Sequence, residues 1–269
     1  LWLSRKFIGL ERELPLLQKE LLSDWWSDNK LEQNNHNITV WVIADIFTQY
    51  YDVDIGRDML NLLKKCKVNI RVIFPKVSIV AMISYGFLDE AKDGLKALYN
   101  QLDNISKNDI IVGIEPSEVL VWRDEAKSLF NGNLLNVLLF EEMLLKLDLL
   151  SALPKFNAIQ SKVWVYEHCH QKALTTTESL IKSIKLIPEI QFEIIEGGCC
   201  GMAGDFGYKY SKISEKIAHN SLDVYMKKIN SCDVLIATGI SCRRQILDIF
   251  KFESNHLVQL FSRSLRNKC

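Results

Sequence analysis

The sequence predicts an α/β fold built from two similar lobes, each with a mainly parallel sheet flanked by helices. Two observations predict this fold. Short apolar runs rich in β-branched residues alternate with longer segments of helical apolar spacing, which is typical of βαβ units. The same series of segments then occurs a second time along the chain, at an offset of 123 to 124 residues.

The first half contains three strand-like runs, at 39–44, 69–74 and 109–114. Between them lie 54–65 and 87–102, where apolar residues recur at helical spacing. Strands that alternate with helices are joined by crossovers and therefore run parallel. The first half is thus predicted to form one parallel α/β unit.

The second half repeats this order, with strands expected at 163–167, 191–195 and 233–238. The segment DIIVGIEPSE at 109–118 aligns with DVLIATGISC at 233–242, and the first strands of the two halves align at nearly the same offset. A nearly constant offset over separate segments favours an internal duplication. We therefore expect two pseudo-repeated, Rossmann-like lobes.

The segments that join and precede the lobes are expected to be helical. Leu14, Leu17 and Leu21 recur at helical spacing, and Pro15 would lie in the first turn of that helix, where proline is tolerated. A leucine-rich stretch separates the two repeats. The predicted division is a helical lead-in at 1–36, a first lobe at 37–130, a helical connector at 131–160 and a second lobe at 161–269.

The composition excludes some classes of protein. The chain has 269 residues, a formal net charge of zero and 48% hydrophobic residues, so charge gives no reason to expect a nucleic-acid partner. No apolar run is long enough to span a bilayer, and no secretory signal pattern is present. A cytoplasmic location is expected. Because the sequence starts at Leu1, it is expected to be part of a longer polypeptide.

Cysteine is concentrated near one end of the sequence. Six of the seven cysteines fall within the last 101 residues. A disulfide scaffold would favour a small secreted protein with an even number of cysteines. Clustered thiols in this chain therefore favour metal or redox chemistry.

The cysteines of the second half follow its strands. Cys169 comes after the first strand, Cys199 and Cys200 after the second, and Cys242 after the third. Parallel strands end at the same edge of a sheet, which is where open α/β sheets bind ligands. Four thiols that are distant in sequence are therefore expected to converge there.

The residues around the thiols also suit such a site. Adjacent cysteines on a regular strand would face opposite ways, so Gly197, Gly198 and Gly201 are expected to allow a sharp turn and the close approach of a bulky cofactor. Cys242 is expected to open a helix beside Arg243. Both features favour a thiolate, which is the form that binds metals.

Further candidates flank the cysteines. His168 and His170 are candidate metal ligands or hydrogen-bond donors to the ligands. Lys172, Arg243, Arg244 and Gln245 are candidates for the surrounding layer, where the cations would balance negative charge or simply be solvated. Cys66, Cys232 and Cys269 are expected to be small apolar core residues, and His219 and His256 to be ordinary surface or core histidines.

The second-half motifs resemble a known family. HCHQKAL at 168–174, GCCGMAGDFGY at 198–208 and SCRRQI at 241–246 are similar to the cysteine-rich "CCG" domain. This domain occurs in heterodisulfide reductase subunits and in iron–sulfur subunits of glycolate and glycerol-3-phosphate dehydrogenases. It also occurs at the C-terminus of fused FAD-linked oxidases that act on D-2-hydroxy acids, and the resemblance is greatest to these fused oxidases.

The first half resembles the same fused oxidases. The similar segments are RELPLL at 12–17, SYGFLDEAK at 84–92 and GIEPSEVLVWRDE at 113–125, so the resemblance covers most of the chain. The lobe at 37–130 is then a degenerate first CCG-like lobe, because 79–81 replaces the CCG triplet with Ile-Val-Ala.

The other ligand positions of the first lobe are also replaced. Glu118 stands in place of the next cysteine, and Asp45 and Phe47 stand where the second half has its two histidines. No cluster is expected in this lobe. Asp45 and Glu118 remain a candidate pair of carboxylates at its sheet edge.

The resemblance implies a cofactor and partners. Cys169, Cys199, Cys200 and Cys242 would hold a [4Fe–4S] or related iron–sulfur cluster, with Gly198 and Gly201 beside it. Electrons would pass from FAD, through a ferredoxin-like segment with cubane clusters, to an acceptor such as a quinone. The chain has neither a GxGxxG fingerprint nor a CxxCxxCxxxCP run. The flavin domain is therefore expected in another part of the protein or in another subunit, with the whole peripheral at the inner face of a membrane.

Three alternatives remain open. Heterodisulfide reductase members often carry CxxC at the third motif, whereas this chain has a single cysteine there, and four thiolates also suit a structural zinc ion. Zinc could equally replace a cluster in the purified protein. Cys199 and Cys200 could instead react directly with a substrate in a thiol–disulfide redox module. The chain could finally be a non-catalytic interaction module.

Overall fold

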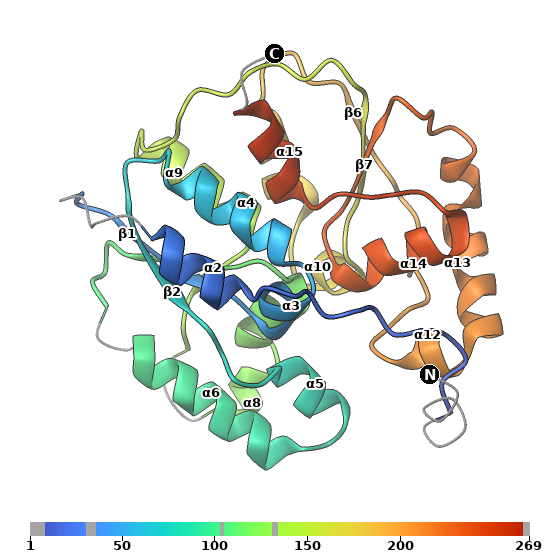
Figure 1. Cartoon of the computed structure of the whole chain (residues 1–269), viewed down its shortest axis with the longest axis horizontal. Coiled ribbons are helices and arrows are strands. Elements are labelled where there is room, and N and C mark those ends of the chain that lie inside the picture. The colour runs from blue at the N-terminus through green and yellow to red at the C-terminus, as the bar shows by residue number, and fades with distance from the viewer. Residues whose placement is uncertain (1–8, 31–35, 103–104, 131–133, 266–269) are drawn as a thin grey trace.

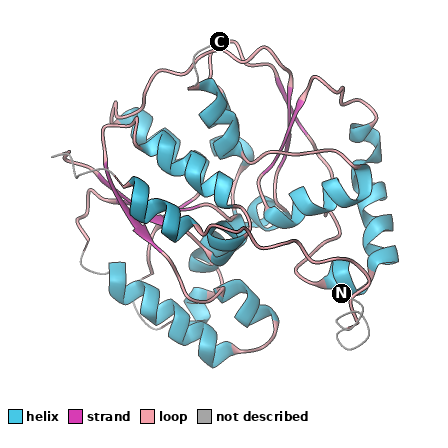
Figure 2. Ribbon diagram, in the orientation of Figure 1, coloured by secondary structure: helices cyan, strands magenta, loops and turns pink. Residues whose placement is uncertain are grey.

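The computed structural model describes residues 9–30, 36–102, 105–130 and 134–265. These residues form two α/β lobes that lie side by side, one blue to green and the other yellow to red in Figure 1. Each lobe has a small sheet with helices packed around it, as Figure 2 shows. The predicted fold class is confirmed.

The first lobe follows the lead-in helix α2 (Leu22–Asn29). Its elements, in chain order, are β1 (Thr39–Ile43), α3 (Ile46–Tyr50), α4 (Val53–Leu63), β2 (Asn69–Ile73), α5 (Ile79–Ser84), α6 (Leu88–Leu102), β3 (Ile110–Gly113), α7 (Pro116–Leu120), the 3-10 turn η1 (Val121–Arg123), α8 (Ala126–Leu129), β4 (Val137–Leu138) and α9 (Phe140–Leu149).

The second lobe has fewer strands. Its elements, in chain order, are β5 (Val163–Tyr166), α10 (Cys169–Leu174), α11 (Thr177–Ile184), β6 (Phe192–Ile194), α12 (Phe206–Lys209), α13 (Ser211–Met226), β7 (Val234–Ala237), α14 (Ile240–Phe250) and α15 (Leu257–Ser264).

The strand order supports the predicted duplication. The first sheet is ordered β2-β1-β3-β4 and the second β6-β5-β7, and each strand pairs in parallel with its neighbours. In both sheets the first strand of the lobe lies between the second and the third. All six strands predicted from the sequence are present, each within one or two residues of the expected bounds.

The two lobes also share a side-chain hydrogen bond. The indole nitrogen of Trp41 on β1 donates to Asp109 at 3.0 Å, and that of Trp164 on β5 donates to Asp233 at 3.0 Å. Both pairs join the central strand to the residue just before the third strand. The second pair lies 123 to 124 residues after the first, which is the offset found in the sequence.

The lead-in differs from the prediction. Leu14 and Leu17 are exposed, and the helix that they predicted is not formed; α2 begins only at Leu22. Backbone hydrogen bonds hold the preceding segment in an extended path, from Glu11 N–H to the Tyr208 carbonyl and from Gln18 N–H to the Tyr50 carbonyl. Without a surface to cover, the apolar stripe has no reason to become helical.

The connector is only partly helical. Within 134–160, the part of the connector that the structure describes, α9 is the helix, and the preceding β4 joins the edge of the first sheet. Leucines on α9 such as Leu144 and Leu147 are fully buried, because this helix packs between the two lobes. The leucine-rich pattern therefore indicated which residues are buried, but it overestimated the length of the helix.

The hydrophobic core is continuous between the lobes. Helix α15 of the second lobe packs against α4 of the first, beside which it lies in Figure 1, and α11 packs against α9. Phe261 on α15 is buried and makes an edge-on contact with Phe140. Among the described helices, none is both long and apolar enough to cross a bilayer.

Candidate functional site

Four of the cysteines of the second lobe meet at the carboxyl edge of its sheet. Cys169 is the first residue of α10, directly after β5, and Cys242 lies in the first turn of α14, after β7. Cys199 and Cys200 lie in the irregular segment that follows β6. The parallel pairing of these strands places all three turns on one side, as the sequence predicted.

The sulfurs form a continuous line of neighbours. Cys199 lies near both Cys169 and Cys200, close enough for each pair to shift one another's pKa, and Cys200 lies near Cys242 in the same way. None of the four is in a disulfide. Cys200 and Cys242 are buried, whereas Cys169 and Cys199 are exposed. The line therefore runs from the lobe surface into its interior.

The shape of this line bears on what it could hold. Around one tetrahedral zinc ion, with Zn–S bonds of about 2.3 Å, all sulfur pairs lie about 3.8 Å apart. No three of the four sulfurs, all of which lie in the described part of the chain, come within 4.8 Å of one another.

The closeness of the thiols shifts their pKa values in opposite directions. Hydrogen bonding with Cys199 raises the pKa of Cys169 and of Cys200. Thiol donation from Cys169 and Cys200, aided by the Gly201 N–H at 3.3 Å, lowers the pKa of Cys199. Closely spaced thiols cannot all ionise without a compensating positive charge, and that is what a metal centre supplies.

The glycines of the turn have different reasons to be there. Gly201 has φ +87°, and a Cβ at this position would lie 2.5 Å from the Ser214 carbonyl oxygen. Gly197 and Gly198 have ordinary backbone angles, contrary to the expectation, but a Cβ would meet Ser221 at 2.8 and 3.0 Å respectively. These two glycines permit close packing on α13 rather than an unusual turn.

Lys172 and Tyr166 support the same segment. The Lys172 ammonium donates to the Gly197 carbonyl at 2.8 Å and lies 4.9 Å from the centre of the Tyr166 ring. The Tyr166 hydroxyl donates to the Gly198 carbonyl. Two side chains, one of them positively charged, thus hold the turn that leads to Cys199.

The helix that carries Cys242 is fixed by the first lobe. The Glu115 carboxylate accepts a hydrogen bond from the Ile240 N–H, the first of α14, at 2.9 Å. Arg243 donates to the Ala237 and Thr238 carbonyls and to Asp52 of the first lobe. Arg243, a candidate for balancing charge around the thiols, thus also joins the two lobes.

Two further residues expected around the site have other partners. Arg244 donates to Asp248 on its own helix at 3.0 Å. The Gln245 amide donates to Ser214 on α13 and its oxygen accepts from Arg12 of the lead-in at 2.6 Å. These contacts hold α14 against α13 and against the lead-in, so both residues support the fold of the site from outside.

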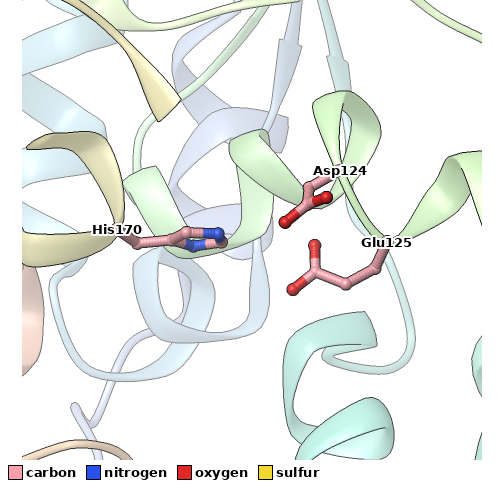
Figure 3. Close-up of side chains that lie close together, drawn as sticks. All are labelled: Asp124, Glu125 and His170. Carbon is pink, nitrogen blue, oxygen red and sulfur yellow. The ribbon is translucent and has the colours of Figure 1, made fainter. Parts of the chain in front are cut away.

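The two histidines beside Cys169 differ in their surroundings. His168 is buried, which lowers the pKa of its imidazole to about 4, and its Nδ1 has no hydrogen-bond partner. His170 is half-buried, and Figure 3 shows its ring pointing toward Asp124 and Glu125 of the first lobe. The rings of the two histidines lie 6.5 Å apart.

The matching edge of the first lobe carries carboxylates. Asp45 is buried and caps α3 by accepting from the Thr48 N–H at 2.9 Å. Glu118 accepts from the Ser78 hydroxyl, and burial raises the pKa of Glu118 to about 7. Both line a small cavity, and burial raises the pKa of Asp45 as well. Both expected carboxylates thus lie at this edge.

Most remaining cysteines and histidines have ordinary surroundings. Cys66 is buried in the core, and burial raises the pKa of its thiol to about 12. Cys232 is exposed, so it is not the small core residue that was expected. His219 lies on the surface of α13, and His256 is buried at the start of α15. Cys269 lies outside the described residues.

Sequence reasoning missed the contribution of the first lobe to the site. Glu115 and Asp52 reach the second lobe through contacts between residues 125 and 191 positions apart. The only signal was the alignment of 109–118 with 233–242, which puts the loop of Glu115 and the loop of α14 at equivalent edges. Nothing in the pattern indicated that the two edges face each other.

A broad cleft lies between the lead-in and the two lobes. Its volume is about 710 Å³, and its lining includes Leu14, Leu16, Tyr51, Met202 and Arg244. The exposed leucines of the lead-in thus form part of its wall.

Comparison with known proteins finds dehydrogenases. The chain is 29% identical to D-2-hydroxyglutarate dehydrogenase of Escherichia coli K12, over 96% of this chain and 26% of the relative. It is 28% identical to the D-2-hydroxyglutarate dehydrogenase of Haemophilus influenzae, over 86% of this chain and 24% of the relative. The chain therefore spans about a quarter of the length of these relatives.

A third relative is of a different kind. The chain is 21% identical to a subunit of the anaerobic glycerol-3-phosphate dehydrogenase of Escherichia coli K12, over 96% of this chain and 67% of the relative. No family model matches the chain. The relatives are dehydrogenases or part of a dehydrogenase, and these similarities support a component of an oxidoreductase.

Proposed function

We propose that this chain is the electron-transfer part of a flavin-linked oxidoreductase, and that Cys169, Cys199, Cys200 and Cys242 hold an iron–sulfur cluster. The observation that carries the proposal is the convergence of four thiols from three separate strand ends. An iron–sulfur centre of the [4Fe–4S] type takes four such thiolates and supplies one-electron transfer.

The donor set suits an iron–sulfur cluster. Four thiolates are the ligands that a [4Fe–4S] cluster takes, and they equally suit a zinc ion, so the iron, zinc and sulfide content decides between the two. Gly197 and Gly198 lie close to Ser221, so the turn that carries Cys199 and Cys200 packs tightly against α13. A compact turn of this kind leaves the sulfurs, rather than other side chains, at the edge of the sheet.

The residues around the thiols would tune and shield such a centre. The Gly201 N–H already donates to the Cys199 sulfur, and hydrogen bonds to sulfur affect the potentials of iron–sulfur clusters. Lys172 would compensate negative charge on one side. Cys169 and Cys199 are exposed, so a partner would exchange electrons with the cluster from their side.

The rest of the electron path would lie outside this chain. Since the chain matches about a quarter of the D-2-hydroxyglutarate dehydrogenases, we propose an FAD-binding dehydrogenase domain and a ferredoxin-like segment elsewhere in the same protein or in a partner subunit. The whole protein would oxidise a D-2-hydroxy acid and pass electrons to an acceptor such as a quinone. Attachment at the inner face of a membrane would come through such partners.

The test is anaerobic purification followed by a visible spectrum and counts of iron, zinc and acid-labile sulfide. We expect broad visible absorption with iron and sulfide in similar amounts, lost in the Cys199→Ser, Cys200→Ser double variant. Cys232→Ser is the matched control, because Cys232 is an exposed thiol of the same lobe outside the group of four. A colourless protein that binds no iron after anaerobic reconstitution would contradict the proposal, and bound zinc would favour a structural metal site.

One observation favours a second candidate, a thiol–disulfide redox module. Cys199 is exposed, its pKa is lowered, and Cys169 and Cys200 stand beside it as potential resolving thiols. In that case the metal-free protein would be the active form. Alkylation with iodoacetamide would then be selective for Cys199 at neutral pH, and iron would neither bind nor protect the thiol.

A further inference from the structure

We propose that Asp124, Glu125 and His170 form a binding site for a divalent cation at the junction of the two lobes. Figure 3 shows the two carboxylates and the imidazole turned toward one another across that junction. The site contains no sulfur ligand and is separate from the line of thiols. It would take an ion that prefers oxygen and nitrogen ligands, such as Mn²⁺.

The geometry brings three donor atoms of different origin together. One carboxylate oxygen of Asp124, one of Glu125 and a ring nitrogen of His170 all lie within 4.8 Å of one another. Asp124 follows η1, Glu125 precedes α8, and His170 belongs to α10 of the other lobe. Among the described residues, no other three His, Cys, Asp or Glu side chains come this close.

The donors are held by elements in contact. Helix α10, which carries His170, packs against α7, and α7 runs directly into η1. Two short ordered segments therefore fix the separation of the imidazole from the carboxylates. A metal site needs donors whose positions are set by packed neighbours, and this pair of elements provides them.

The polar atoms of this group lack partners of their own. The described residues give no hydrogen bond or ion pair to the side chain of Asp124, Glu125 or His170, and Glu125 Oε2 is buried without a donor. A buried, unsatisfied carboxylate oxygen is costly, so it points to a missing ligand. The adjacent cation is not available, because Arg123 pairs with Glu142.

The donor chemistry defines the class of ligand. Two carboxylates bring negative charge, and a neutral imidazole is the commonest nitrogen ligand of protein-bound metals. Mn²⁺, Fe²⁺ and Zn²⁺ all accept this combination, whereas a soft ion such as Cu⁺ would prefer the thiols. Three protein ligands leave open positions for water. A bound ion would link one lobe to the other beside α10, the helix that begins with Cys169.

Mn²⁺ is the probe that separates this site from the thiols, because it binds thiolates weakly compared with oxygen and nitrogen ligands. The purified chain is titrated with Mn²⁺, and binding is read as loss of the electron paramagnetic resonance signal of the free aqueous ion. We expect one bound ion per chain, and the same result in a variant with serine at all four cysteines of the thiol group.

Two conservative substitutions, Glu125→Gln and His170→Gln, each remove one donor. Since losing an outer-shell partner alone costs about 10–100-fold in metal affinity, each should weaken Mn²⁺ binding by at least that factor. His219→Gln is the matched control, because His219 also lies between two carboxylates, Glu215 and Asp223, but on one exposed helix. Circular dichroism without metal checks that every variant is folded.

Three outcomes would overturn the inference. They are no Mn²⁺ binding at millimolar concentration, unchanged affinity in folded Glu125→Gln or His170→Gln, and equal weakening in His219→Gln. Failure of the thiol centre is a separate result: the proposed cluster is followed by visible absorption, which the His170→Gln variant should retain. Loss of that absorption in His170→Gln would mean that His170 serves the thiol centre and would also overturn the separate site.

Discussion

The two lobes share a strand order but differ at the edge where their strands end. Both have a central first strand, a second strand on one side and a third on the other, and both tie the central strand to the third by a tryptophan–aspartate hydrogen bond. At the carboxyl edge, the first lobe presents Glu118 where the second presents Cys242. The repeated scaffold is thus compatible with two different chemistries.

The difference extends to what each edge does for the other. The first lobe has no thiols at its edge, but its Glu115 caps the helix of Cys242 and its Asp52 pairs with Arg243. Buried packing and backbone pairing preserve a fold, whereas the residues at strand ends are free to vary. The lobe without thiol ligands therefore contributes to the thiol site by positioning it.

The equivalent pair Glu118 and Cys242 gives the largest expected contrast. Cys242→Ser should abolish the visible absorption and iron content of the anaerobically purified protein, because it removes one of four proposed ligands. Glu118→Gln should leave both unchanged, since Glu118 lies at the other edge and bonds to Ser78. Loss of iron in Glu118→Gln would show that both edges serve one centre.

Two glycines of the second-lobe turn, Gly201 and Gly204, are expected to differ in how much an alanine substitution destabilises the fold. Gly201→Ala combines positive-φ strain with a clash against the Ser214 carbonyl, whereas Gly204→Ala, at φ +61°, meets nothing within 4 Å. We expect the free energy of unfolding to fall by about 1–2 kcal/mol for Gly204→Ala, and by about 1–3 kcal/mol more for Gly201→Ala. Urea unfolding of the metal-free protein measures both, and equal losses would argue against the close contact.

Buried carboxylates and buried histidines are expected to make stability respond to pH in opposite directions. Burial raises the pKa of Glu115 from 4.5 to about 8, so the folded state holds a proton that the unfolded state releases, and this contribution to stability is lost as pH rises from about 4.5 to 8. Burial lowers the pKa of His168 from 6.5 to about 4 and that of His256 well below 6.5. Their contribution is lost as pH falls through that range.

A maximum of stability between these limbs should appear in urea unfolding of the metal-free protein at a series of pH values. Glu115→Gln should flatten the decline toward pH 8 while keeping a hydrogen-bond acceptor for the Ile240 N–H. His256→Gln should flatten the decline toward pH 4. A wild-type profile that rises steadily from pH 5 to pH 8 would contradict the burial of the carboxylates.

The smallest expected change in the free energy of unfolding concerns the tryptophan–aspartate hydrogen bond that both lobes contain. Trp41→Phe and Trp164→Phe each remove one indole donor, and each should lower the free energy of unfolding by about 0.5–1.5 kcal/mol. The loss should be larger for Trp164, which is buried, than for Trp41, which is partly exposed. Urea unfolding of the two variants in parallel measures both losses. No change in either variant would mean that these hydrogen bonds do not stabilise the lobes.

Much of each lobe could be predicted from the sequence, because its strands are short β-branched runs and parallel pairing follows from their alternation with helices. The same pattern predicted that the four cysteines would meet at one edge of the second sheet. This prediction was possible because strand ends can be located from the local sequence pattern, and the ends of parallel strands lie at one edge of a sheet.

The rest depended on contacts that no local pattern encodes. Leu14 and Leu17 have helical spacing, yet they belong to an extended segment beside a cleft, because backbone pairing with Tyr50 and Tyr208 holds the chain there. Arg243 was a candidate for balancing charge around the thiols or a solvated cation, and no pattern predicted that it also donates to Asp52 of the other lobe. Both cases concern the relative placement of elements, which composition and periodicity do not determine.

The packing of α15 on α4 bears on how the chain unfolds. The last described helix of the second lobe completes the core of the first, and Leu257, Leu260 and Phe261 are fully buried there. Neither lobe can therefore open without exposing apolar surface of the other. Although the chain carries two repeats, it should melt as one cooperative unit, with a single calorimetric transition whose van't Hoff and calorimetric enthalpies agree.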